Sequence, residues 1–389
     1  CFSVGCKAPG FVNIRCSRTR FNASSRSRIF WTLRIVCVTF APVNVECFLF
    51  MVDVPFQMFT HIMLIPVRIF CGCHLIKLVN IMPLLPHIHI LLCTKDGEAW
   101  IFEQLNSILN QTYSKWSLWI SDDGSSDATL RIVSDVISDN PERYIRLFHG
   151  PQKGCAQNFL SLLIRPELAG SWIAFADQDD IWMPHKLHRA IEMIGRGTGA
   201  QIYAGRCVYI NSIGKPVGVS PLHHRSHDFG NALVQNVLRG NTLVMPPAIS
   251  SYLRTVFALT RELDLPFHDW CIYLAVTGVG FDIIHDEKPG VFYRQHSTNV
   301  LGASRSNMVR RAMLIYRRHY SDWIDRNVNF LGHISPFLDE SNLTLLDKFV
   351  EFRKRRGPLS SSALRRLGIY RQTRTGDYIL QAMSWCGRI

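Results

Sequence analysis

Residues 171–187 read SWIAFADQDDIWMPHKL. The stretch opens with a short apolar run, which is typical of a buried strand, and the run ends at Asp177, where two more acids follow within three residues. Pro184 then favours the first turn of a helix. A buried strand that ends in acidic residues and continues into a helix is typical of a parallel α/β sheet.

Earlier segments repeat this order of strand and helix. We expect buried strands at His87–Thr94, Trp116–Ser121 and Tyr144–His149, each followed by apolar residues at helical spacing. Repeated alternation of strand and helix predicts an α/β fold with a mostly parallel sheet and helices on both of its faces. Ligands of such sheets bind at the carboxyl ends of the strands.

Polar clusters follow three of these strands: Thr94-Lys95-Asp96, Asp122-Asp123 and Asp177–Asp180. Acids gathered at one sheet edge repel one another unless a cation lies between them. An Asp-x-Asp pair offers the hard oxygen ligands that Mg²⁺ or Mn²⁺ prefers, and phosphate oxygens complete the shell. The clusters therefore predict a divalent-metal site for a nucleotide or sugar phosphate. Ordinary solvated loop acids are the alternative, and the chain has no glycine-rich dinucleotide or P-loop motif.

The positive charge of the chain lies mainly outside this region. There are 43 Lys and Arg against 30 Asp and Glu among 389 residues, giving a formal net charge of +13. Much of the excess falls in residues 1–86 and in clusters after residue 304, so the charge is poor evidence for a nucleic-acid partner, and we expect none.

The 47% hydrophobic content excludes disorder as the main state. The 12 cysteines lack zinc spacing and are typical of free thiols in a reducing compartment.

These patterns divide the chain into three parts. Residues 1–86 are an apolar and basic extension without the apolar run of about 20 residues that a membrane helix needs, and we expect them to lie outside the functional domain. A membrane-associated segment and a small folded extension are the alternatives. Residues 87–304 form the α/β domain that holds the acidic clusters. Residues 305–389 form a basic helical region, for which we expect peripheral contact with a membrane or, alternatively, a solvated helical face.

Several motifs resemble family 2 glycosyltransferases of the A-type fold, especially their rhamnosyltransferase-like branch. The resemblance covers about residues 89–304 and rests on DDGSSD (122–127), ADQDDIWMPHKL (176–187), NALVQNVLRGNTLV (231–244), HDWCIYLAVTGVG (268–280) and YRQHSTNVLGAS (293–304). It implies that residues 87–304 are a catalytic domain, with a nucleotide-sugar half at 87–194 and an acceptor half at 195–304. It also implies an inverting, metal-dependent hexosyltransferase that uses a nucleoside-diphosphate sugar, with rhamnose as the first expectation. The acceptor would be a hydroxyl of a saccharide or a lipid-linked saccharide in cell-surface polysaccharide synthesis, on the cytoplasmic side of the plasma membrane.

The resemblance also implies a role for individual residues. Asp269 would be the catalytic base that takes the proton of the acceptor hydroxyl, and capping of a helix is its alternative role. The metal, Mg²⁺ or Mn²⁺, would be held by Asp179, Asp177 and His296. The nucleotide sugar would be bound by Thr94, Asp96, Asp122, Asp123, Lys153, Asp177 and Arg294.

Two other functions fit parts of the sequence. A metal-dependent nucleotidyl- or phosphotransferase would use the same Asp pairs, although the chain lacks an obvious triphosphate loop. A non-catalytic, membrane-associated scaffold with a degenerate transferase domain is the other reading, because Lys95 stands where the family usually has an aromatic residue.

Overall fold

The computed structural model describes residues 85–195, 200–296, 319–354 and 363–389, and in addition the backbone of five strands within the first 85 residues. The chain divides into two compact units, Cys1–Leu85 and Pro86–Ile389. In the first unit β1 (Val12–Arg20), β2 (Thr32–Phe40) and β3 (Val45–Asp53) form an antiparallel sheet. A separate short hairpin pairs β4 (Phe70–Cys71) with β5 (His74–Leu75).

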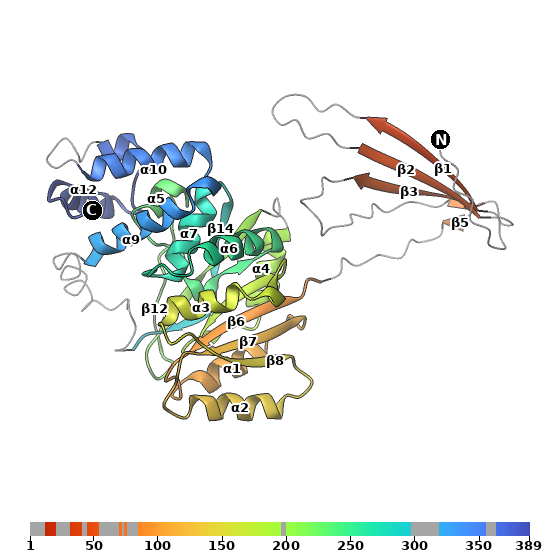
Figure 1. The fold of residues 1–389 in the computed structure, drawn as a ribbon. Helices are drawn as coiled ribbons and strands as arrows, with labels where there is room; N and C mark the ends of the chain where they lie inside the picture. Colours follow the sequence, from red (N-terminus) through yellow and green to blue (C-terminus); the bar gives the residue numbers. More distant parts are fainter. Residues whose placement is uncertain are drawn as a thin grey trace. The chain divides into compact units, whose positions relative to one another are not determined.

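The second unit is built on a nine-stranded sheet (Figure 1). Its parallel part has the order β9-β6-β7-β8, made of β6 (Ile88–Thr94), β7 (Trp116–Asp122), β8 (Ile145–His149) and β9 (Trp172–Asp177). The register places Thr94 opposite Asp122 and Cys93 opposite Asp177. The predicted α/β fold with a mostly parallel sheet is therefore confirmed, and three of its strands end level with one another.

The rest of the sheet mixes both directions. β11 (Gln201–Ile210) runs parallel to β14 (Asp282–Arg294), and the short β13 (Val244–Met245) joins β11 to β9 by antiparallel pairing. β10 (Ile181–Trp182) pairs with the end of β14, and β12 (Pro216–Val219) pairs with β11. Because β10 follows the Asp177–Asp180 loop directly, this pairing brings the end of β14 to that loop.

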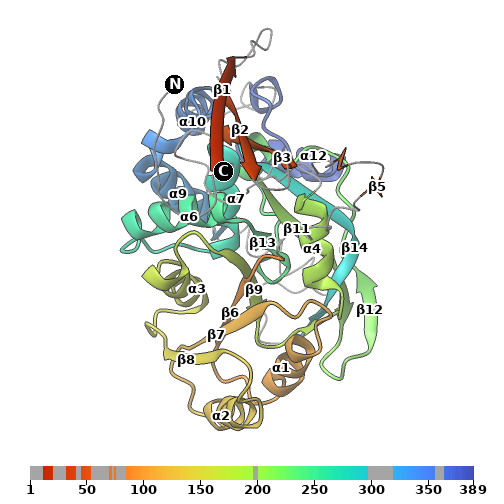
Figure 2. The same ribbon diagram turned by 90° about the vertical axis from the view of Figure 1, so that its right-hand side faces the viewer.

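Side chains of β6 alternate between two cores. Ile88, Ile90 and Leu92 face one core, which also includes residues of α1 (Ile101–Leu109), α2 (Thr129–Asp139) and α4 (Lys186–Gly195). Leu91 and Cys93 face the other, with α3 (Cys155–Leu163), α6 (Pro247–Leu259) and α7 (His268–Gly278). Figures 1 and 2 show these two layers of helices on the two faces of the sheet. Burial on both faces explains why the strands read as continuous apolar runs.

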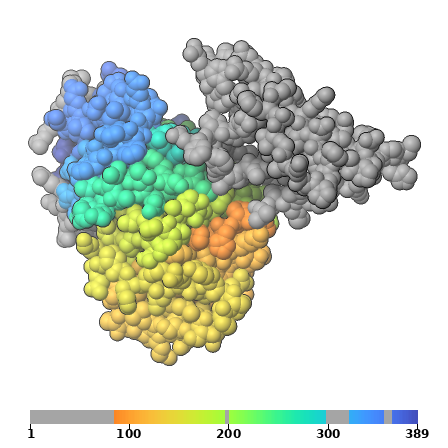
Figure 3. All heavy atoms as spheres, turned by 45° about the vertical axis from the view of Figure 1, so that its right-hand side comes forward, coloured from red at the N-terminus to blue at the C-terminus, as the bar shows by residue number. Residues whose placement is uncertain are grey.

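The C-terminal region is helical, as predicted, with α9 (His319–His333), α10 (Glu340–Arg353) and α12 (Arg374–Trp385). In Figure 3 these helices, in blue, cover the teal segment that contains α6 and α7. The short helices are α5 (Phe229–Ala232) and the 3₁₀ turns η1 (Pro166–Leu168), η2 (Gly240–Thr242) and η3 (Ser335–Phe337). The basic clusters at 305–318 and 355–356 lie outside the described residues.

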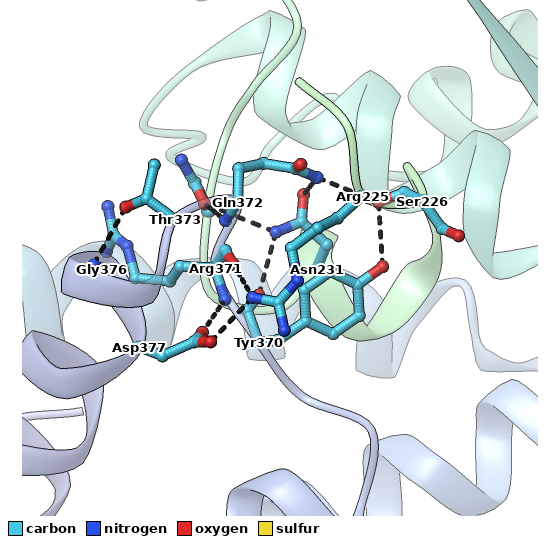
Figure 4. Close-up of polar contacts among 10 residues, drawn as sticks. Arg225, Ser226, Asn231, Tyr370, Arg371, Gln372, Thr373, Gly376 and Asp377 are labelled. Atoms are coloured by element: carbon cyan, nitrogen blue, oxygen red, sulfur yellow. Dashed lines mark hydrogen bonds and ion pairs between the residues drawn. The ribbon is translucent and has the colours of Figure 1, made fainter. Parts of the chain in front are cut away.

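A network of hydrogen bonds fastens the segment before α12 to α5 (Figure 4). Asn231 donates from Nδ2 to the carbonyl of Tyr370 over 2.9 Å, and Gln372 donates from its backbone N to Oε1 of Gln235 over 2.8 Å. A Cβ on Gly230 would lie 2.3 Å from the carbonyl oxygen of Gly368, so only glycine allows this close approach. The C-terminal helices are thus an integral layer of the second unit.

Among the residues that the structure describes, none of the helices combines the length and the apolar character needed to cross a bilayer.

We predict that the second unit folds without the first. A variant that begins at Leu85 should keep the urea midpoint of the catalytic unit, because Pro86–Ile389 is compact by itself. A second variant that begins at Leu92 serves as the comparison, since it removes the fully buried Ile88 and Ile90, each worth about 1.5–3 kcal/mol of burial. The second variant should fail to fold. Aggregation of the first variant would contradict the prediction.

Candidate active site

The loops after β6 and β9 are joined by Gln178. Its Oε1 accepts hydrogen bonds from the hydroxyl of Thr94 and from the backbone N of Lys95, the latter over 2.9 Å, and its Nε2 donates to the carbonyl of Lys95 over 2.9 Å. Thr94 is buried at the end of β6, as expected for a residue at the sheet edge. Sequence reasoning did not select Gln178, although it is the middle residue of the Asp-x-Asp motif.

Asp96 and Asp122 shape the turns after β6 and β7. Asp96 has a left-handed backbone with φ of 46°, and its Oδ1 accepts the backbone N–H of Ser126 over 2.8 Å. Asp122 is buried, and its Oδ1 accepts the N–H groups of Gly124 and Ser125 over 3.1 and 2.9 Å. Asp122 therefore stabilises the turn that follows β7.

Asp123 fixes the loop that leads into α3. Its Oδ1 accepts the backbone N–H of Gln152 over 2.6 Å and its Oδ2 that of Gly154 over 2.8 Å. A Cβ on Gly150 would lie 2.8 Å from the same Oδ1, so the loop passes very close to the carboxylate. Lys153, between the two donors, is exposed to solvent. Buried Asp123 thereby holds a positively charged side chain at this edge of the sheet.

The structure brings Asp269 to the Asp-x-Asp loop. Asp269 lies in the first turn of α7, and its Oδ1 accepts the N–H of Trp270 over 2.8 Å while its Oδ2 accepts that of Gly240 over 3.4 Å. Burial, Asp179 and Asp269 together raise the pKa of Asp177 to about 8. The mutual influence of these carboxylates means that residues about 90 positions apart in sequence share one electrostatic environment at the sheet edge.

Asp179 and His296 form the closest pair of candidate metal ligands. Nε2 of His296 lies 2.6 Å from Oδ2 of Asp179, and the two side chains are 12% and 14% exposed. The imidazole stacks on the indole of Trp100, with ring centroids 4.2 Å apart and planes inclined by 23°. No pattern in the sequence pointed to Trp100, just before α1, as a residue of the site. The stacking restricts the orientation of the ring, which suits a ligand or a hydrogen-bonding partner of Asp179.

Arg294 is buried and donates to several protein acceptors. Its Nε donates to the carbonyl of Asp179 over 2.9 Å, its Nη1 to the carbonyl of Ser212 over 2.9 Å, and its Nη2 to the carboxylate of Glu103. Sequence reasoning placed this guanidinium against the nucleotide sugar. In the structure it fixes the backbone of the Asp-x-Asp loop.

Asp180 lies behind the loop and is fully buried. It accepts the backbone N–H of Arg294 over 3.0 Å and the Nδ2 of Asn241, while burial, followed by Asp179 and Asp177, raises its pKa well above the usual range. Buried Lys186 places its Nζ 3.3 Å from the ring centroid of Trp182. Burial lowers the pKa of this amine, and Asp180 and Asp177 oppose that shift. Trp182 is 2% exposed and therefore packs in the core.

A metal ion at this edge of the sheet would need the substrate of the enzyme to supply some of its ligands. Among the side chains that the structure describes, no group of three or more His, Cys, Asp or Glu residues is arranged to hold a metal ion. Asp179 and His296, both partly exposed, offer one carboxylate and one imidazole. Mg²⁺ and similar ions at phosphate sites are commonly held by one or two carboxylates, substrate phosphates and waters, so this pair fits such a site.

A family model matches the segment that carries the acidic sheet edge. Residues 89–259 match the model described as Glycosyl transferase family 2. The dTDP-rhamnosyl transferase RfbG of Shigella flexneri is 28% identical over 249 residues, which are 62% of this chain and 84% of that protein. The UDP-Glc:alpha-D-GlcNAc-diphosphoundecaprenol beta-1,3-glucosyltransferase WfgD of Escherichia coli is 34% identical over 107 residues, 28% of this chain and 40% of that protein.

Solved structures with a similar course of the chain have low sequence identity. Residues 1–349 of S. aureus TarS match with a TM-score of 0.46 and 14% identity, covering 67% of this chain and 69% of that one. The mannosyltransferase PcManGT of Pyrobaculum calidifontis matches with a TM-score of 0.41 and 14% identity, covering 77% and 87%.

The sheet with its acidic edge and the family match together define an enzyme that transfers a sugar: the protein is a glycosyltransferase. Within it, the segment that carries β6 to α6 is a glycosyl transferase family 2 domain. This assignment favours the transferase expectation over a nucleotidyltransferase or a non-catalytic scaffold.

We predict that Gly97→Ala destabilises the catalytic edge. A Cβ at this position would lie 2.2 Å from Oε1 of Gln178, so the Gln178 side chain would have to leave its three hydrogen bonds. The free energy of unfolding should fall by about 1–3 kcal/mol in urea titrations. Gly332→Ala is the matched control, because a Cβ there meets nothing within 4 Å in helix α9, and it should be neutral or stabilise by about 0.5–1 kcal/mol. Equal stability of the two variants would contradict the conclusion that Gln178 stabilises the loops after β6 and β9.

Proposed function

We propose that this glycosyltransferase moves a hexose, with rhamnose as the first candidate, from a nucleoside-diphosphate sugar to a hydroxyl of a saccharide or lipid-linked saccharide. The similarity to a dTDP-rhamnosyl transferase over 84% of the length of that protein supports the sugar. The name of WfgD, which includes a diphosphoundecaprenol-linked acceptor, supports the acceptor class. Synthesis of a cell-surface polysaccharide is the process that these relatives favour.

The observation that carries the proposal is the position of Asp269 beside the Asp-x-Asp loop. A hydroxyl is a poor nucleophile until a base accepts its proton, and Asp269 is a half-buried carboxylate at the helix start. In the proposed step the acceptor oxygen attacks the anomeric carbon as the bond to the diphosphate oxygen breaks. The hydroxyl proton goes to Asp269, the electron pair of the broken bond leaves with the nucleoside diphosphate, and the configuration is inverted.

Asp179 and His296 would hold the divalent metal, Mg²⁺ or Mn²⁺, and Asp177 lies in the same electrostatic environment. Such an ion stabilises the negative charge that develops on a leaving diphosphate. The chain itself supplies a fixed position for these ligands, because Arg294 holds the Asp179 backbone and Trp100 orients His296.

The loops after β6 and β7 would border the nucleotide. Thr94 and Asp96 belong to the first loop, while Asp122 and Asp123 belong to the second and fix its turn and the loop that carries Lys153. We assign the exposed Lys153 to contact with the donor. Asp122, Asp123 and Arg294 then contribute as positioning residues, through the backbone groups that they hold.

We place the enzyme on the cytoplasmic side of the plasma membrane. The described cysteines, Cys93, Cys155, Cys207, Cys271 and Cys386, are all free thiols, which is typical of a reducing compartment.

Replacement of the proposed base gives the first activity test. Asp269→Asn keeps the size of the side chain and an oxygen that can accept the N–H of Trp270, so folding and donor binding should persist. Sugar transfer should fall roughly 10²–10⁴-fold, the usual contribution of a positioned base. Asp264→Asn is the control, because Asp264 is an 81% exposed acid of the preceding loop. Transfer by Asp269→Asn at the wild-type rate would move the base to another residue.

The proposed metal ligand gives a second test with its own measurement. Asp179→Asn removes one charge but little volume, so the fold should persist while Mn²⁺-dependent binding of a nucleoside diphosphate, measured by calorimetry, weakens by at least about tenfold. Asp135→Asn on α2, where the acid is 65% exposed, should bind like the wild type. Unchanged Mn²⁺ dependence in Asp179→Asn would remove Asp179 from the metal site.

A further inference from the structure

A second concave site lies in the C-terminal layer. It is a pocket of about 390 Å³ between the start of α12 and the segment 364–370. Leu364, Ile369 and Leu380 contribute apolar, buried side chains to its lining. Its charged lining residues are Arg225, Arg365 and Arg374 against one acid, Asp377. The pocket is therefore basic, and none of its lining residues belongs to the catalytic edge.

The single acid of this pocket is already neutralised. Oδ2 of Asp377 lies 2.7 Å from Nη1 of Arg225, and Oδ1 accepts the backbone N–H of Arg371 over 2.7 Å (Figure 4). Arg225 is also held over the ring of Tyr370, with its Cζ 4.5 Å from the centroid. Within the described part of the chain, by contrast, no hydrogen bond or ion pair joins the guanidinium group of Arg365 or Arg374 to another residue. Two exposed guanidinium groups are thus left to face a ligand.

The start of α12 adds to this positive potential. Thr373 caps the helix by accepting the N–H of Gly376 over 3.0 Å, and Arg374 is the first helical residue. The amino end of a helix carries a partial positive charge and favours anions. Guanidinium groups bind phosphate through paired hydrogen bonds. The helix start, the two arginines and the cavity together favour the binding of a phosphate group.

Helix α12 carries two exposed aromatic side chains, one of which belongs to the pocket. Tyr378 also lines the pocket and is 65% exposed, and Trp385 is 60% exposed. Their separation of seven positions places them on one side of the helix, in line with Arg374 four positions earlier. We call this stripe of Arg374, Tyr378 and Trp385 the outer face of α12. Exposed tyrosine and tryptophan beside arginine are typical of surfaces that lie at the headgroup level of a bilayer.

We propose that the outer face of α12 binds an anionic phospholipid bilayer and that the pocket accepts the phosphate of a lipid headgroup. The charge of Arg365 and Arg374 is complementary to such a surface, and the aromatic rings would lie between headgroups and acyl chains. This docking surface is independent of the proposed sugar and acceptor, so it is tested without measuring transfer.

The first experiment is sedimentation of the full chain with vesicles. Vesicles of equal parts phosphatidylglycerol and phosphatidylcholine should bind the protein, and vesicles of phosphatidylcholine alone should not. The double variant Arg365→Gln with Arg374→Gln should weaken binding about 10- to 30-fold. Arg131→Gln with Arg261→Gln removes the same charge from exposed ion pairs elsewhere and should bind like the wild type. Equal loss in both double variants, or equal binding to both vesicles, would overturn the proposal.

The second experiment reports on the aromatic side chain and the source of the phosphate. Phosphatidylglycerol with brominated acyl chains should quench part of the tryptophan fluorescence of the wild type and less of it in Trp385→Phe. Identical quenching in the two proteins would overturn the placement of α12 in the bilayer. Saturable binding of soluble glycerol 3-phosphate that the two arginine substitutions abolish, without any vesicle binding, would assign the pocket to a free phosphate ester and also overturn the membrane proposal. The near-ultraviolet circular dichroism of each variant verifies its fold.

Discussion

The catalytic edge of the sheet depends on the hydrogen bonds that the buried carboxyl group of Asp180 accepts. A carboxyl group without solvent is strongly unfavourable unless hydrogen bonds replace its hydration, and two segments supply them: Asn241 from η2 and the backbone N–H of Arg294 from β14. Because Arg294 also holds the carbonyl of Asp179, and Gly240 beside Asn241 donates to Asp269, this one group connects the Asp-x-Asp loop with both later segments. The enzyme's acids are therefore positioned by residues that do no chemistry themselves.

The two-faced sheet explains how so many polar groups are tolerated at its edge. Packing of apolar side chains on both faces of β6, β7 and β9 supplies most of the favourable burial, so the loops at their carboxyl ends are free to hold strained or charged residues. The left-handed Asp96 and the mutually repelling Asp177 and Asp179 all lie at or beyond the last residue of their strands. Strain and like-charge repulsion of this kind are typical of edges that bind a cationic or metal-bearing ligand.

The second unit contains two kinds of arginine, one at the end of β14 and one in the C-terminal layer. Arg294 is buried beneath the catalytic loop, and its hydrogen bonds are structural. Arg365 and Arg374 are exposed around a concave surface, where a guanidinium can still exchange its hydration for a ligand. A buried arginine thus positions the catalytic loop, whereas exposed arginines can bind a ligand. The degree of burial decides between these two roles.

The parallel half of the fold follows from local sequence patterns, because buried parallel strands read as short apolar runs and each is followed by a helix at close range. The sequence also placed the acids at the strand ends, since the strands stop where polar residues begin. The mixed half of the sheet could not be predicted from the sequence. Its strands β10 and β13 are only two residues long, and their pairing depends on segments about 70 to 110 positions away. Three features of the site depend on tertiary structure. Asp269 comes close enough to Asp177 to influence its pKa, Arg294 is buried, and Gln178 joins the loops after β6 and β9. Whether a carboxylate or guanidinium faces solvent or protein depends on neighbours that are distant in the chain, and no local pattern encodes them.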